Sequence, residues 1–258
     1  MHSTHDFKSW SDYFIRNRNS LHLIPWKEAQ WLSEKEFEKI RKSIAVFQKG
    51  ESSDGKHLIQ KAHKNAMKTG DKNYFDALML FINEEHRHSF DLKRFMMIQG
   101  IPLLKTHWTD WIFRRLRNLG GLETSISVLL TAEIIATVYY DALSKATDST
   151  VLKSICHQIL EDEDMHIRFQ SEGLSRFYVK RKFLTNAMIH LIRRILLEAT
   201  MHAVWIDHRK VFKAGGYGFF SFRQSALSEF CRTIHIVQSV FLKQRLESIN
   251  LKLNFVNK

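Results

Sequence analysis

Apolar residues recur three or four positions apart over most of the chain, which is the spacing of one face of an α-helix. The only prolines are Pro25 and Pro102, and the alternating pattern of β-strands bounded by Asn-Gly or Asp-Gly turns is largely absent. Glycines and polar residues interrupt the periodic stretches and mark helix ends. These breaks predict helices at residues 33–48, 51–69, 72–99, 106–118, 121–145, 149–178, 182–212 and 221–249. The predicted fold class is therefore all-α.

Composition is typical of a globular protein that folds without disulfide bonds. The chain has 258 residues, 44% of them hydrophobic, enough to bury a large core. Cys156 and Cys231 lie far apart and match no zinc-ligand spacing. The N-terminus lacks the basic-then-apolar order of a secretory signal. We therefore expect a cytoplasmic protein.

The longest apolar run covers residues 126–140 and contains a single charge, Glu133. It is shorter than the roughly 20 residues that a bilayer requires. We interpret it as a buried helix and expect no membrane span.

The net charge of +12 does not select one kind of partner. Nucleic acid, anionic lipid and an acidic protein, such as a carrier or an electron donor, all respond to the same field. One segment interleaves aromatic and basic residues as platforms for single-stranded nucleic acid do: Trp108, Trp111, Phe113, Arg114, Arg115 and Arg117. Its spacing equally fits an amphipathic helix docked on a bundle, and we favour that interpretation over nucleic-acid binding. A homodimer is also compatible with the sequence.

Two Glu-x-x-His pairs occur inside helical segments, Glu85 with His88 and Glu163 with His166. Residues three apart share one helix face, so each pair offers two metal ligands from one helix. The composition gives about 0.8 such pairs by chance, so the pairs alone are weak support.

Glu133 strengthens the case for a metal. A carboxylate in so apolar a helix costs several kcal/mol unless something compensates it. A divalent cation would do so, and a core arginine is the alternative. If the flanking helices turn near Asp148, Glu133 and Glu163 each lie 15 residues from that turn and face each other. The same reasoning applied to Glu85 leads to position 56, where no glutamate exists, which leaves Glu51 and Asp54 as the nearest acids.

Four carboxylates and two imidazoles would balance the charge of two ferrous ions and leave positions open for oxygen. An iron and manganese pair is the alternative. At this point the pattern resembles the ferritin-like di-iron carboxylate superfamily, in which two helices give one Glu each and two give a Glu-x-x-His each. The order along the chain matches: Glu51, Glu85, His88, Glu133, Glu163 and His166.

The resemblance implies a single domain, 1–258, with a metal-binding four-helix core at 51–178. Residues 1–50 would be an N-terminal helical extension and 179–258 C-terminal capping helices. Gly50-Glu51-Ser52 is similar to the opening of the first ligand helix in rubrerythrins, which favours Glu51 over Asp54. By the same resemblance Glu85 and Glu163 would bridge the two metals. The chain lacks the Cys-x-x-Cys pairs of rubrerythrin and is longer at both ends, which favours the oxygenase and oxidase branches.

Several further residues are expected to lie near this centre. Tyr140 follows Glu133 by two helical turns and should share its face, as a hydrogen-bond partner or as a plain core tyrosine. Glu198 and His202, four apart, are expected to form a buried hydrogen-bonded pair beside a substrate cavity rather than another metal site. Glu84, Asp162 and Asp164 would be surface acids or acids behind the metal ligands.

The sequence therefore favours a di-iron oxidoreductase in which two ferrous ions activate O₂ to oxidise a small organic substrate under the C-terminal helices. One alternative is an iron-handling or peroxide-scavenging protein, which would need no apolar pocket. Another is a metal-free basic scaffold or nucleic-acid-binding protein with internally paired carboxylates.

Overall fold

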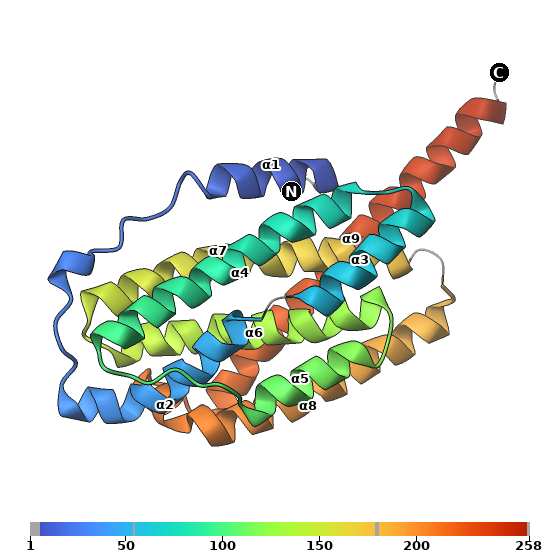
Figure 1. Cartoon of the computed structure of the whole chain (residues 1–258). Coiled ribbons are helices and arrows are strands. Elements are labelled where there is room, and N and C mark those ends of the chain that lie inside the picture. The colour runs from blue at the N-terminus through green and yellow to red at the C-terminus, as the bar shows by residue number, and fades with distance from the viewer. Residues whose placement is uncertain (1–5, 54, 179–180, 257–258) are drawn as a thin grey trace.

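The computed structural model describes residues 6–53, 55–178 and 181–256, and the regular elements of this part of the chain are all helices, without strands (Figure 1). The all-α prediction is confirmed. The helices are α1 (Phe7–Asn17), η1 (Trp26–Glu28), α2 (Glu34–Glu51), α3 (Lys56–Thr69), α4 (Asn73–Ile98), α5 (Trp108–Asn118), α6 (Leu122–Ala146), α7 (Thr150–Tyr178), α8 (Phe183–Ala214) and α9 (Phe219–Val256).

Helices α6 and α7 form the centre of the molecule (Figure 1). They pack against each other along their length, joined by a short turn near Asp148, as the sequence predicted. Helix α4 packs against α7, and α3 packs against α4 and α6. Helix α2 packs against α4, α6 and α8, while α8 lies on α6 and α9 lies on both central helices. The C-terminal end of α9 projects beyond the other helices.

Helix α6 is long and apolar enough to cross a membrane, the single such helix among the described residues. Most of it is buried inside the protein, which is typical of the core helix of a soluble protein. The prediction of a buried helix at residues 126–140 is thus confirmed.

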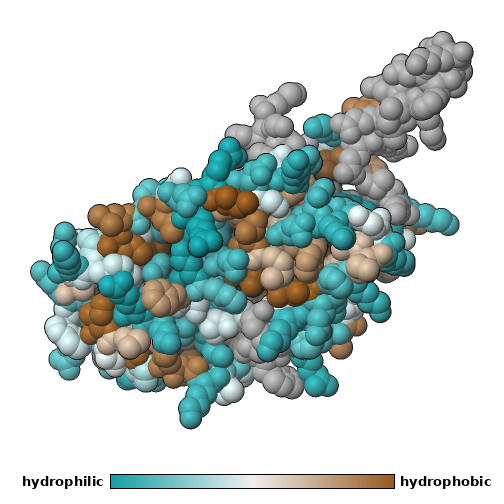
Figure 2. Space-filling model, turned by 45° about the horizontal axis from the view of Figure 1, so that its top comes forward, coloured by the Kyte–Doolittle hydropathy of each residue, from teal (hydrophilic) through white to brown (hydrophobic). Residues whose placement is uncertain are grey.

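The face that includes α1 and α4 shows hydrophobic residues scattered among hydrophilic ones (Figure 2).

Helix α1 lies in the expected N-terminal helical extension but is not among the helix ranges predicted from the sequence. It begins with Asp6, whose side chain accepts a hydrogen bond of 2.7 Å from the Ser9 amide, an N-cap that stabilises the first turn. Trp10 and Phe14 are buried, with ring centroids 5.5 and 5.3 Å from Phe169 of α7. Apolar side chains on one face therefore hold this short helix against the bundle.

The boundary between the second and third helices differs from the prediction. Glu51 was expected to open a helix at 51–69, but it is the last residue of α2, and α3 begins only at Lys56. Gly50 lies within α2 and does not break it. The break comes at Gly55, whose φ of 61° lies in the left-handed region that glycine adopts without strain. The similarity to the opening of a rubrerythrin helix therefore does not extend to the local structure.

The C-terminal helices agree with the prediction, although α9 extends further than expected. Gly215 and Gly216 form the turn between α8 and α9. A Cβ atom on Gly215 would lie 2.3 Å from the carbonyl oxygen of Ala142, so the absence of a side chain lets this turn approach α6 closely.

Candidate metal centre

The structure brings all six predicted ligand residues together in the bundle interior. They form two groups, and within each group one ligand atom from every residue lies within 4.8 Å of the others. The first group contains Glu51, Glu85, His88 and Glu163, and the second Glu85, Glu133, Glu163 and His166. Glu85 and Glu163 belong to both, so this arrangement has the form of two adjacent sites that share two carboxylates.

Four helices supply these side chains: α4 and α7 give a Glu and a His each, and α2 and α6 one Glu each. Glu133 and Glu163 lie side by side across the α6–α7 contact, as their equal distance from the turn predicted. Glu51 reaches the centre from the C-terminal end of α2, which packs against α4. Asp54, the alternative to Glu51, lies outside the described residues.

Both imidazoles direct Nδ1 toward the shared carboxylates. His88 Nδ1 lies 4.0 Å from both Glu85 Oε1 and Glu163 Oε1. His166 Nδ1 lies 2.9 Å from Glu85 Oε1 and 3.8 Å from Glu163 Oε2. Neither Nδ1 atom makes a well-aligned hydrogen bond, and His166 Nδ1 is paired with Glu85 by charge alone. Both nitrogens therefore face the space between the carboxylates, which a cation or protons can fill.

Six buried side-chain atoms that lack a hydrogen bond lie together in these two groups. Buried side-chain atoms without a hydrogen bond include Glu85 Oε1, Glu133 Oε1, both carboxylate oxygens of Glu163, His88 Nδ1 and His166 Nδ1. Leaving such groups buried and unsatisfied costs about 1–3 kcal/mol each, and more when they are charged. Oxygen and imidazole nitrogen donors clustered in this way fit divalent iron or manganese.

Protonation is the alternative to a cation. Burial, followed by the charge of Glu85, raises the pKa of Glu51 to about 8. Burial also raises the pKa of Glu133, and burial with the charges of Glu133 and Glu85 raises that of Glu163. These carboxyl groups would take up protons unless cations replaced the protons.

A second layer of acids holds the other nitrogen of each imidazole. His166 Nε2 lies 3.0 Å from Oε2 of Glu84, and His88 Nε2 lies 2.9 Å from Oδ2 of Asp162. Each histidine thus contacts an acid from the opposite helix, a contact that orients the ring and directs Nδ1 to the centre. Burial alone would raise the pKa of Asp162, but the hydrogen bond and charge of His88 hold it below its usual range.

Asn17 joins these two acids and was not found by sequence reasoning. Its Nδ2 atom donates hydrogen bonds of 2.7 Å to both Glu84 and Asp162. It lies at the C-terminal end of α1, so the N-terminal helix covers the centre and completes its second layer. An asparagine in an unrecognised helix gave no signal in the sequence.

Other predicted neighbours have different outcomes. Tyr140 donates a hydrogen bond of 2.6 Å to Glu51, so it lies directly behind a candidate ligand.

The expectation of a buried Glu198–His202 pair beside a cavity is wrong. Glu198 forms ion pairs with Arg194 and Arg223, and His202 is exposed. Asp164 is a surface acid, as expected.

A mainly apolar cavity of about 160 Å³ adjoins the centre. Glu51, Glu85 and Glu133 form part of its wall, and the rest is largely aliphatic and aromatic. Phe113 and Arg117 of α5 also line it, so this part of the aromatic and basic segment faces inward. The side chains of Trp111 and Arg114 in that segment lie outside the described residues.

Comparison with known proteins identifies no family for this chain. No family model matches it, and no curated protein matches its sequence.

Proposed function

We propose that the chain is a ferritin-like di-iron carboxylate protein that uses O₂ to oxidise a small organic substrate. The observation that carries this proposal is the convergence of unpaired, buried ligand atoms from four helices. An internally paired scaffold would instead show arginine or lysine side chains hydrogen-bonded to these carboxylates, but Glu133 Oε1 and both carboxylate oxygens of Glu163 have no hydrogen-bond partner among the described residues. The charge of Arg117, which lines the cavity with Glu133, lowers the pKa of Glu133 less than burial raises it.

The ligand set suits two ferrous ions, or one iron and one manganese. Four carboxylates balance the charge of two dications, and Glu85 and Glu163 are shared between the two groups. Glu51 with His88 would complete one site, and Glu133 with His166 the other. When bound, such ions supply the electrons that activate O₂.

The protein's own residues would orient the ions, exclude water and hold the substrate. Glu84 and Asp162 fix the histidine rings through Nε2. The apolar walls of the cavity exclude water and favour a substrate with an apolar body. This cavity supports the oxidase interpretation over iron handling or peroxide scavenging, which requires no organic pocket. A cytoplasmic setting and electron supply by an acidic partner protein belong to the same proposal.

Metal content per chain tests the proposal. We expect about two iron ions per chain after anaerobic ferrous loading of the wild-type protein, and new visible absorption after exposure to air. Glu133→Ala and Glu163→Ala proteins should hold fewer ions while their helical circular dichroism is unchanged. Asp164→Asn is the matched control, because Asp164 adjoins Glu163 in sequence but lies on the surface. Full metal content in the Glu133→Ala protein would refute the ligand assignment.

A further inference from the structure

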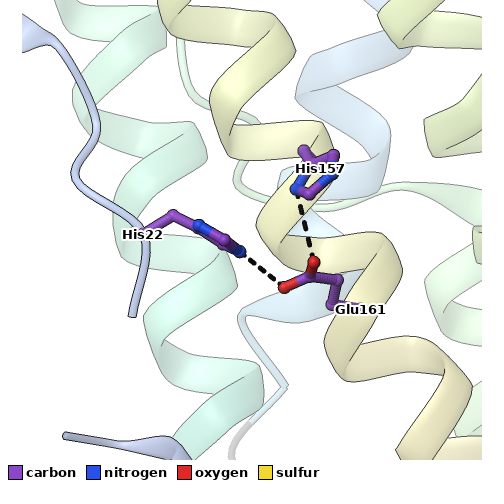
Figure 3. A group of neighbouring side chains, drawn as sticks. All are labelled: His22, His157 and Glu161. Atoms are coloured by element: carbon purple, nitrogen blue, oxygen red, sulfur yellow. Dashed lines mark hydrogen bonds and ion pairs between the residues drawn. The ribbon is translucent and has the colours of Figure 1, made fainter. Parts of the chain in front are cut away.

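A second group of potential metal ligands is exposed and shares no residue with the buried centre. Figure 3 shows its three side chains. The Glu161 carboxylate lies between the imidazoles of His22 and His157. Glu161 Oε2 is 2.7 Å from His22 Nε2, and Glu161 Oε1 is 3.7 Å from His157 Nδ1. The three side chains each offer a ligand atom within 4.8 Å of the others, and each is about half exposed or more.

Two separate parts of the chain form this group. His157 and Glu161 lie four residues apart on α7 and therefore on the same helix face. His22 lies in the linker between α1 and η1. The backbone amide of His22 donates a hydrogen bond of 2.8 Å to Oε1 of Gln158, which holds the linker against α7. The imidazole is thereby kept beside Glu161 rather than free in solvent.

We infer that His22, His157 and Glu161 bind a late first-row divalent cation, with Zn²⁺ as its representative. Two imidazole nitrogens and one carboxylate oxygen are the donors of many three-ligand zinc sites, and solvent can fill the fourth position. Neutral imidazoles also favour such ions over magnesium or calcium, which prefer oxygen ligands alone. None of the three residues belongs to the buried centre, so this site stands whether or not that centre holds iron.

The bound cation fastens the linker to α7 at a position next to the buried centre. Gln158, which accepts the hydrogen bond from the His22 amide, donates through Nε2 to Oδ2 of Asp162 at 3.2 Å. Asp162 in turn contacts His88 and accepts a hydrogen bond from Asn17, which lies just before the linker. Zinc at the surface therefore stabilises the covering segment that contributes Asn17.

Zinc binding to four full-length proteins tests the site. Wild-type, His22→Ala, His157→Ala and His235→Ala proteins are dialysed to equilibrium against Zn²⁺, and bound zinc per chain is measured by mass spectrometry. His235 is the control because it is an exposed histidine on α9, outside this group. Any zinc in the buried centre is common to all four proteins. We expect the wild-type and His235→Ala proteins to hold about one zinc more than the other two.

Hydrogen exchange of residues 18–25 gives a second readout. Zinc should slow amide exchange in this linker in the wild-type protein but not in His157→Ala, a substitution that leaves the linker and its hydrogen bonds to α7 intact. Equal zinc content in all four proteins would overturn the site. Linker exchange that zinc leaves unchanged in the wild-type protein would overturn the fastening of the linker.

Discussion

The hydroxyl of Tyr140 donates a hydrogen bond of 2.6 Å to Oε1 of Glu51, across 89 positions of sequence. It links the C-terminal half of α6 to the last residue of α2. Burial and the charge of Glu51 raise the pKa of Tyr140 well above its usual value, so the phenol remains a donor. Glu51 is the one candidate ligand at a helix end, and this bond supports its position from the apolar core.

Replacing Tyr140 with Phe should loosen Glu51. A buried carboxylate loses a hydrogen-bond donor, which should lower the free energy of unfolding by about 1–3 kcal/mol. We also expect weaker binding of one of two ferrous ions, measured by anaerobic titration. Tyr139→Phe is the matched control, because Tyr139 is equally buried but contacts Ser43 instead of a carboxylate. Identical ferrous affinities in the two variants would show that the hydrogen bond does not support a ligand.

Asn17→Ala should weaken the metal centre without removing a ligand. Its amide is the shared donor to Glu84 and Asp162, and loss of groups behind metal ligands typically costs about 10–100-fold in affinity. Ferrous or Mn²⁺ titration with calorimetry measures this change. Asn19→Ala is the control, because Asn19 is exposed just after α1 and its side chain donates a hydrogen bond to the Ile15 carbonyl rather than to either acid. Equal affinities of the two variants would contradict a role for α1 at the centre.

The sequence predicted most of the candidate centre because its ligands lie within long, regular helices. Fixed spacing placed Glu85 with His88 and Glu163 with His166, and the lone charge in an apolar helix identified Glu133. Glu51 lies in the candidate centre but on α2 rather than at the start of the following helix, since Gly50 seemed a stronger break than it is.

Contacts made by short or irregular segments were not predictable in this way. Asn17 and His22 reach their partners only because α1 and the following linker fold over α4 and α7, and no periodicity encodes that path. The Glu198–His202 prediction was wrong for a related reason. Helical spacing places residues on one face but does not reveal that Arg223 of another helix pairs with Glu198.

The stability of the metal-free protein should fall as pH rises from about 6.5 to about 8. Burial and the charge of Glu85 raise the pKa of Glu51 from 4.5 to about 8, so the folded state holds a proton that the unfolded chain has lost. This stabilisation is complete below pH 4.5 and is lost as pH rises through about 8. Burial lowers the pKa of His208 from 6.5 to about 3, which has the opposite effect, but only below pH 6.5.

Thermal midpoints measured across this range, with chelator and with bound Mn²⁺, test the expectation. Cations replace the protons, so metal binding strengthens with rising pH and the two curves should diverge. A metal-free midpoint that rises between pH 6.5 and 8 would contradict the raised pKa of the buried carboxyl groups.

Two glycine substitutions should have opposite effects on stability. Gly215→Ala would place a methyl group against the main chain of α6 at Ala142, which must shift, and we expect a loss of about 1–3 kcal/mol in the free energy of unfolding. Gly50→Ala meets no atom within 4 Å and lies inside α2, so it should gain about 0.5–1 kcal/mol. Urea denaturation measures both.

Because Gly50 precedes Glu51, unchanged iron content in a stabilised Gly50→Ala protein would also confirm that α2 continues to its last residue as a helix. Destabilisation by Gly50→Ala would instead indicate that the helix breaks where the sequence first suggested.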